Sequence, residues 1–208
     1  MTSEHKFHSY VTVATVMVMY FMIENVAPFL NEFGVAKPIV TLLSAVGIYN
    51  LFAKILSSLA RNWLWLKKHL LGASFLNGTW VGEFKGSNNE KIIMVEAFDQ
   101  TLNHLVIRGE AFKENGESYA QWISKATFIN EVDGVLTYTY TCDKDDDKST
   151  FQGVCVFNFE REAAHLPPTY IKGYSTDVID GVRTSNREKK IEDKLLPLLE
   201  AFELAKNA

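Results

Sequence analysis

The chain has 208 residues with 21 lysines and arginines against 25 aspartates and glutamates, so its formal net charge is −4. This balance argues against a general nucleic-acid binder, which needs a basic footprint, and we expect neither DNA nor RNA as a partner. It does not exclude a small anionic ligand held by a few local charges. The two cysteines, Cys142 and Cys155, are too few for a disulfide framework, and we expect free thiols in a reducing compartment.

Two apolar stretches occupy most of the first seventy residues. The first runs from about residue 10 to 30 and the second from about 38 to 60. A membrane-spanning helix needs about 20 mostly apolar residues. The alternative is an amphipathic hairpin buried in a soluble protein, but these stretches are apolar on every face. The sequence therefore predicts a transmembrane helical hairpin over residues 1–70.

Basic and aromatic residues follow the second apolar stretch, namely Arg61, Trp63, Trp65, Lys67 and Lys68. Such a mixture is typical of the cytoplasmic membrane interface, and cytoplasmic loops carry an excess of lysine and arginine. We therefore expect a multi-pass protein of the bacterial inner membrane, with both termini and everything after the hairpin in the cytoplasm.

Glu24 stands within the first apolar stretch. A carboxylate in a membrane span is a candidate functional residue, because burying a charge in lipid is costly. It is a candidate for lining a pore or for joining neighbouring hairpins in an oligomer. The alternative is an interfacial residue at the outer end of the span.

Alternation of apolar and polar residues begins after residue 77 and continues over most of the remaining chain. Turn signals such as Asn115–Gly116, Asp133–Gly134 and Asp180–Gly181 separate the runs. Eight short strands with hairpin-length connections predict an up-and-down antiparallel β-barrel over residues 71–190. A barrel of eight strands is either filled by side chains or holds one small ligand.

Helical spacing returns in the last part of the chain and predicts a C-terminal helix over residues 191–208. Pro197 is expected to kink or split this helix, because proline lacks a backbone donor. We expect the helix to cap the barrel, and the alternative is a helix that binds a partner or a membrane surface.

Catalytic and metal-binding signatures are missing from the sequence. It contains no G-x-S-x-G, H-E-x-x-H or G-x-x-x-x-G-K-[ST] motif, which argues against an enzyme. Asp143, Asp145 and Asp147 have the spacing that opens a calcium loop, but Lys148 stands where that loop needs glycine. We therefore expect no metal site and no cofactor.

The layout and two short motifs resemble one known family. These are a G-x-W-x-G first strand and a final hairpin of the form G-Y-S-T-D followed by D-G-V-R. The residues concerned are Gly78, Trp80, Gly82, Gly173, Tyr174, Ser175, Thr176, Gly181 and Arg183. The chain resembles the two-transmembrane, β-strand-rich effectors of bacterial cyclic-oligonucleotide anti-phage signalling (CBASS).

The resemblance implies a barrel that binds a cyclic dinucleotide made by a partner nucleotidyltransferase. Binding would promote homo-oligomerisation, and the assembled membrane helices would disrupt the lipid bilayer. The alternative function is a membrane-anchored, lipocalin-like carrier of a small apolar ligand. A structural anchor with a filled barrel is a third possibility.

A site for such a ligand needs aromatic faces for the bases and a few donors for the phosphates. The alternation places Arg108 in phase with Val106 and Phe112, on a face that we expect to be interior. It also places Trp122 on the same face of its strand as Phe128. The candidate ligand-binding residues are Arg108, Trp122, Tyr138, Tyr140, Tyr174 and Arg183.

The alternative for the aromatic candidates is core packing, since tyrosine and tryptophan suit strands intrinsically. Arg183 follows a turn, and it could be a rim residue without a role. We expect Trp80 to be a structural plug at one end of the barrel and not a platform for the ligand.

Overall fold

The computed structural model describes residues 2–30, 37–86, 89–145, 149–179 and 181–206. Asp147, Lys148 and Asp180, which the sequence places in loops and turns, lie outside these ranges. The chain divides into two compact units, Met1–Leu70 and Leu71–Ala208. The predicted fold class is confirmed: two apolar N-terminal helices precede a closed eight-stranded antiparallel barrel and a C-terminal helix.

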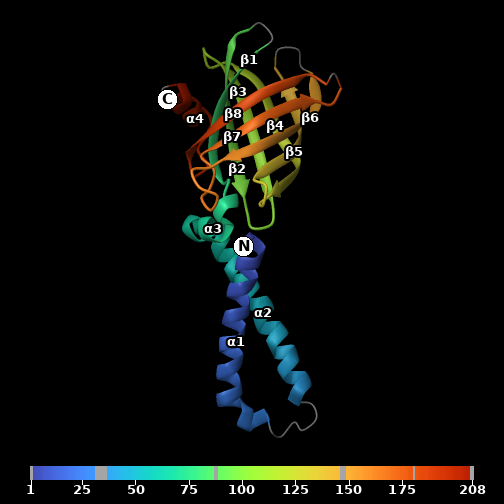
Figure 1. Cartoon of the computed structure of the whole chain (residues 1–208), viewed down its shortest axis with the longest axis vertical. Coiled ribbons are helices and arrows are strands. Elements are labelled where there is room, and N and C mark those ends of the chain that lie inside the picture. Colours follow the sequence, from blue (N-terminus) through green and yellow to red (C-terminus); the bar gives the residue numbers. More distant parts are fainter. Residues whose placement is uncertain (1, 31–36, 87–88, 146–148, 180, 207–208) are drawn as a thin grey trace. The chain divides into compact units, whose positions relative to one another are not determined.

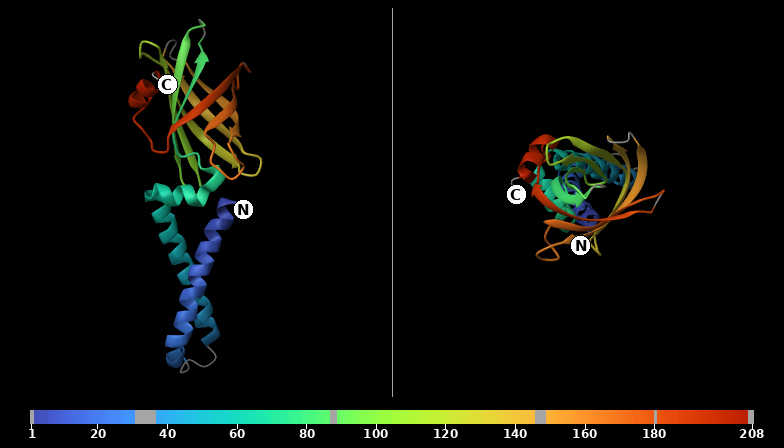
Figure 2. Two further views of the ribbon diagram at one scale, coloured as in Figure 1. Left: turned by 60° about the vertical axis from the view of Figure 1, so that its left-hand side comes forward. Right: turned by 90° about the horizontal axis from the view of Figure 1, so that it is seen from above.

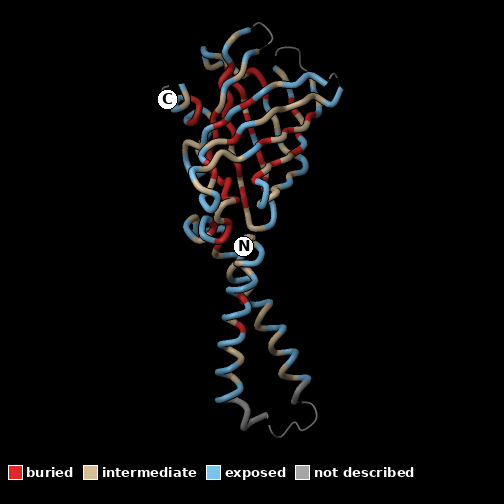
Figure 3. The backbone as a smooth tube through the Cα atoms, viewed as in Figure 1, coloured by how far each residue is buried: buried red, intermediate tan, exposed pale blue. Residues whose placement is uncertain are grey.

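The first unit is helical and consists of α1 (Ser3–Leu30), α2 (Lys37–Asn62) and nearly all of α3 (Leu64–Leu71) (Figure 1). Helices α1 and α2 each contain a segment long and apolar enough to cross a membrane. Most of their large apolar side chains are exposed (Figure 3), as expected of helices whose natural surroundings are lipid.

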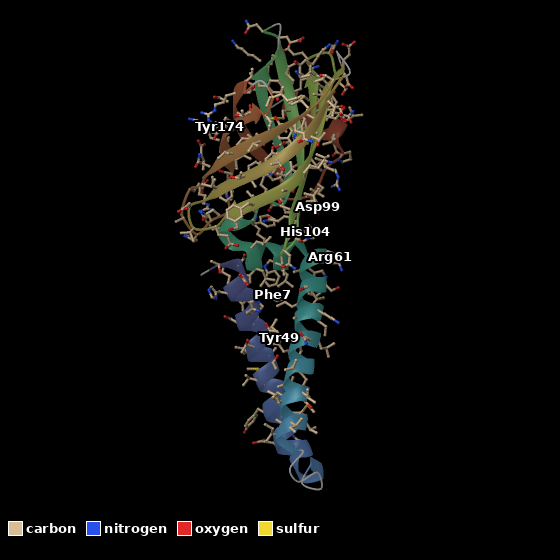
Figure 4. All side chains as sticks on the ribbon, turned by 90° about the vertical axis from the view of Figure 1, so that its right-hand side faces the viewer. Phe7, Tyr49, Arg61, Asp99, His104 and Tyr174 are labelled. Carbon is tan, nitrogen blue, oxygen red and sulfur yellow. The ribbon has the colours of Figure 1, made fainter. Side chains whose placement is uncertain are left out.

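Polar contacts within this unit join its helices. His8 Nδ1 and the Tyr49 hydroxyl form a hydrogen bond between α1 and α2, and Figure 4 labels Tyr49. Farther along α1, the Tyr20 hydroxyl donates a 2.5 Å hydrogen bond to Oε1 of Glu24, and both side chains are exposed. The Glu24 carboxyl therefore has a partner one helical turn away on its own helix.

The second unit is the barrel, whose strands each pair antiparallel with the next, and β8 pairs with β1 to close the ring (Figure 2). The strands are β1 (Gly78–Lys85), β2 (Lys91–Gln100), β3 (Leu105–Lys113), β4 (Ser118–Asn130), β5 (Val135–Lys144), β6 (Thr150–Glu160), β7 (Tyr170–Asp177) and β8 (Arg183–Glu192). Gly181, in the turn before β8, has φ of +70°, which favours glycine.

The end of the barrel at which β1 begins is filled by apolar side chains. Trp80 is fully buried there, stacks near Phe98 with ring centroids 5.4 Å apart, and donates its indole hydrogen bond to the Leu76 carbonyl at 2.8 Å. This agrees with the prediction of a structural plug, because the ring and its only donor are both used within the protein.

A β-bulge in β4 changes which side chains point inward. The pairing of β4 with β5 slips between Ser124 and Ala126, so inward and outward positions exchange beyond this point. The prediction that Phe128 and Trp122 share a face is therefore wrong: Trp122 points into the barrel, and Phe128 is 66% exposed on the outer wall.

The C-terminal helix is shorter than predicted. Strand β8 continues to Glu192, because its last residues pair with β1 and close the barrel, and α4 spans only Leu198–Lys206. Pro197 directly precedes the helix and does not kink it. A backbone N–H at the start of a helix has no acceptor within the helix, so proline loses no hydrogen bond there. Helix α4 packs outside β1–β3 and caps the barrel wall, with Phe202 buried against Phe112.

A candidate ligand cavity inside the barrel

A cavity of about 310 Å³ lies in the half of the barrel toward which β1 ends. Its walls come from β1, β2 and β4–β8. The lining includes five aromatic side chains, namely Phe84, Tyr119, Trp122, Tyr140 and Phe151. The interior is thus filled at one end and hollow at the other, which is the arrangement of a barrel that holds a small molecule.

Two carboxyl groups are buried beside this cavity. Glu96 on β2 and Glu188 on β8 are each 1% exposed, and Glu96 lines the cavity. Oε1 of Glu96 accepts a 2.6 Å hydrogen bond from Nε1 of Trp122 and a 3.1 Å bond from the Tyr138 hydroxyl. The Glu188 carboxyl lies within hydrogen-bonding reach of the Glu96 carboxyl.

Burial governs the ionisation of these groups. Loss of solvation raises the pKa of Glu96, and burial together with the neighbouring Glu96 carboxyl raises the pKa of Glu188 well above its ordinary value. Burial likewise raises the pKa of the Cys142 thiol to about 12. Ionising both carboxyls at once is therefore disfavoured, and the pair favours a shared proton. The Cys142 thiol on the cavity wall stays neutral at neutral pH.

Glycines make room for the aromatic side chains. A Cβ atom at Gly109 would lie 2.1 Å from Cε2 of Trp122, and a Cβ atom at Gly153 would lie 2.3 Å from Cζ of Tyr140. Both contacts are far below van der Waals distance. The missing side chains on β3 and β6 thus allow the indole to reach Glu96 and the phenol to lie across the wall.

Three of the predicted site residues point into the barrel. Trp122 and Tyr140 line the cavity, while Tyr138 is buried outside the lining and donates a hydrogen bond to Glu96. Both cysteines are free, as predicted, and both are buried. Tyr138 is therefore a core-packing residue, whereas Trp122 and Tyr140 are positioned to contact a molecule in the cavity.

Tyr174 and Arg183 lie together on the outer wall, away from the cavity, and Figure 4 labels Tyr174. The Arg183 guanidinium carbon is 3.7 Å from the centroid of the Tyr174 ring. Arg187 lies over Tyr170 in the same way at 4.3 Å and forms a 2.7 Å ion pair with Glu160. This outer hollow on β7 and β8 is cationic and aromatic, and it is a second place where an anion could bind.

Arg108 is exposed on the outer wall, so the prediction that its face is interior is wrong. The error has a physical cause. Phe112, which shares that face, is buried because α4 covers it from outside the barrel. The apolar residue in phase with Arg108 therefore marks the contact with α4 on the outside of the barrel, and it does not mark an inward-facing position.

Three buried polar residues at the floor of the cavity were not predicted from the sequence. Glu96 and Asn186 line the cavity, and Glu188 lies behind the lining beside Glu96. A signal for Glu96 existed, since it stands in phase with Met94 and Phe98 in an otherwise apolar run. For Asn186 and Glu188 there was none, because every residue of the eighth strand except Ile191 is polar.

Comparisons with known proteins leave the family open. No protein-family model matches the chain, and the search of curated proteins found no match. A solved structure that matches is titled a de novo design of a fluorescence-activating β-barrel. It is 15% identical, the alignment covers 57% of this chain and 96% of that one, and the TM-score is 0.36.

Proposed function

We propose that the barrel binds a cyclic dinucleotide in its open half and that the helical hairpin is a membrane-disrupting element controlled by that binding. The protein then acts as a non-enzymatic anti-phage effector. The observation that carries the proposal is a cavity with aromatic side chains in its wall, in a chain that also contains two helices apolar enough to span a membrane.

The cavity lining offers both kinds of contact that a nucleotide needs. Tyr119 and Tyr140 present rings on which a base can stack. Lys85 and Lys144 at the strand ends offer cations to phosphate, and Lys144 Nζ lies 5.2 Å from the Phe151 ring centroid. Asp177 also lines this region, but one of its oxygens accepts a 2.7 Å hydrogen bond from the Ile179 amide.

Activation requires that the ligand favour one state of the protein over another, since equal affinity shifts nothing. We propose that the bound state self-associates and brings several hairpins together in the bilayer of the inner membrane, with the barrel in the cytoplasm. We propose that Glu24 contributes to such an assembly, because a carboxylate in a span gains from polar neighbours.

The test is to express the full chain in bacteria with an inducible cyclic-dinucleotide synthase and to measure uptake of a membrane-impermeant dye. We expect dye uptake only when both proteins are present and the synthase is active. Tyr140→Ala should abolish it, while Thr139→Ala, the neighbouring exposed outward position, should not. Dye uptake that does not depend on the synthase would refute the proposal.

The two alternative functions have less support. An apolar ligand in the cavity would leave Glu96 and Asn186 facing a group that cannot hydrogen-bond, which costs free energy. A purely structural anchor is expected to have a filled barrel, and this barrel is hollow in one half.

A further inference from the structure

The floor of the cavity is unusual in having hydrogen-bond acceptors without donors. Four buried oxygens, namely Oε2 of Glu96, both carboxyl oxygens of Glu188 and Oδ1 of Asn186, accept no hydrogen bond from the part of the chain that the structure describes. Buried polar atoms are nearly always paired in folded proteins. Such a cluster therefore points to a partner outside the chain.

The neighbouring donors are already engaged. The Trp122 indole and the Tyr138 hydroxyl both donate to Oε1 of Glu96, and the Asn186 amide nitrogen lies 3.4 Å from the Ser175 hydroxyl. Trp122 and Tyr138 thus hold the Glu96 carboxyl in one orientation. Because both side chains donate to Oε1, neither donates to Oε2 of Glu96.

The glutamate pair supplies one proton for several oxygens. Each carboxyl is only an acceptor until one takes up a proton, and each of its oxygens has two lone pairs. A proton shared between the two carboxyls therefore leaves a lone pair free on Oε2 of Glu96. The other Glu188 oxygen and Oδ1 of Asn186 remain without a donor. Of the floor residues, Glu96 and Asn186 line the cavity, so their oxygens are the ones a ligand can reach.

We infer that the floor of the cavity, formed by Glu96 and Asn186, recognises a nucleobase edge that presents adjacent N–H donors, as guanine does. The aromatic walls favour a flat group, and the unpaired acceptor oxygens of the floor favour a group that donates hydrogen bonds. Pairing two parallel N–H groups with fixed acceptors gives geometric selectivity. This inference rests on the proposed function, since it names the base that the cyclic dinucleotide would carry.

The test compares two ligands on the unmodified full chain in detergent micelles by isothermal titration calorimetry. They are cyclic di-GMP and its inosine analogue, which lacks only the 2-amino donor. We expect the inosine analogue to bind at least about tenfold more weakly, as for loss of one good base-edge contact. In Glu96→Gln, which replaces an acceptor with a donor, this ratio should fall to about threefold or less. Glu162→Gln, at an exposed position, should keep the wild-type ratio.

The outcomes separate this inference from the proposed function. Equal affinity for the two ligands, or binding of cyclic di-UMP alone, would overturn the donor-edge inference and leave nucleotide binding intact. A full ratio that persists in both Glu96→Gln and Asn186→Ala would also overturn it. Absence of binding by cyclic di-GMP, cyclic di-AMP and cyclic di-UMP would overturn the proposed function together with the inference.

Discussion

The indole nitrogen of Trp122 and Oε1 of Glu96 are joined by a 2.6 Å hydrogen bond inside the barrel. The bond links β4 to β2 across the position where Gly109 of β3 has no side chain. It holds a buried carboxyl at the wall of the cavity, so it ties the stability of the barrel to the geometry of its candidate site.

Replacing Trp122 by phenylalanine should destabilise the protein, because the buried Glu96 loses a donor. We expect a loss of about 1–3 kcal/mol in the free energy of unfolding, the usual cost of leaving a buried acceptor unpaired. Denaturant unfolding of the full chain in detergent measures it. Trp65→Phe, at an exposed position, is the control, and equal effects of the two changes would contradict the role of this bond.

Stability should fall as the pH rises. The folded-state pKa of Glu96 and Glu188 is raised above the unfolded value, so the folded chain binds more protons than the unfolded chain above pH 4.5. Stability from this source is fully present below the unfolded pKa and is lost as pH rises through the folded pKa. Tyr138 and Cys155 face the same pair, and burial raises the pKa of both well above the ordinary value, so they stay neutral over this range.

The thermal midpoint of the wild type should therefore decrease from pH 5 to pH 8. Glu188→Gln removes one ionisation and should flatten this profile, whereas Glu162→Gln should leave it unchanged. A wild-type midpoint that rises over this range, or a Glu188→Gln profile as steep as the wild type, argues against a protonated pair.

A methyl group at Gly153 should disturb the cavity wall. The added Cβ would lie 2.3 Å from Cζ of Tyr140, so the ring must move into the cavity or the strands must part. We expect Gly153→Ala to lower the free energy of unfolding by about 1–3 kcal/mol, which is typical of overpacking a core. The same change should weaken ligand binding. Gly47→Ala, where nothing lies within 4 Å, is the control and should not lower stability.

The cations at the cavity and on the outer wall should behave differently. Lys144→Ala should weaken binding of a cyclic dinucleotide by about tenfold at low salt and by less at high salt, because the contact is electrostatic. Arg108→Ala should have no effect, because Arg108 is exposed on the outside of the barrel. Calorimetry at two salt concentrations measures both, and a larger loss at Arg108 would place the site on the outer wall.

Local sequence patterns were sufficient to predict the strands, their turns and their pairing order, because each strand alternates and each connection is short. They were insufficient where tertiary structure changes the phase. The bulge at Ser124–Ala126 turns Phe128 outward, and closure against β1 extends β8 to Glu192. Helix α4 buries Phe112 from outside, which made the face of Arg108 resemble an interior one.

The candidate site was predicted in part, for a related reason. Trp122 and Tyr140 were identified from aromatic character and lie on the cavity wall. Glu96 on β2 and Glu188 on β8 are 92 residues apart in the sequence, so no local pattern predicts that they are neighbours. Only closure of the barrel makes them neighbours.

The most direct test of cavity binding is a thermal-shift measurement on the full chain in detergent with cyclic dinucleotides. Ser175→Phe fills the cavity from β7, and Ser185→Phe adds the same ring on the exposed face of β8. At a ligand concentration about 100 times the dissociation constant, binding adds about 2.7 kcal/mol to the stability of the folded state. We predict that cyclic dinucleotides raise the thermal unfolding midpoint of the wild type and of Ser185→Phe. They should not change the midpoint of Ser175→Phe. A shift that survives in Ser175→Phe, or a wild type that no cyclic dinucleotide stabilises, would contradict ligand binding inside the barrel.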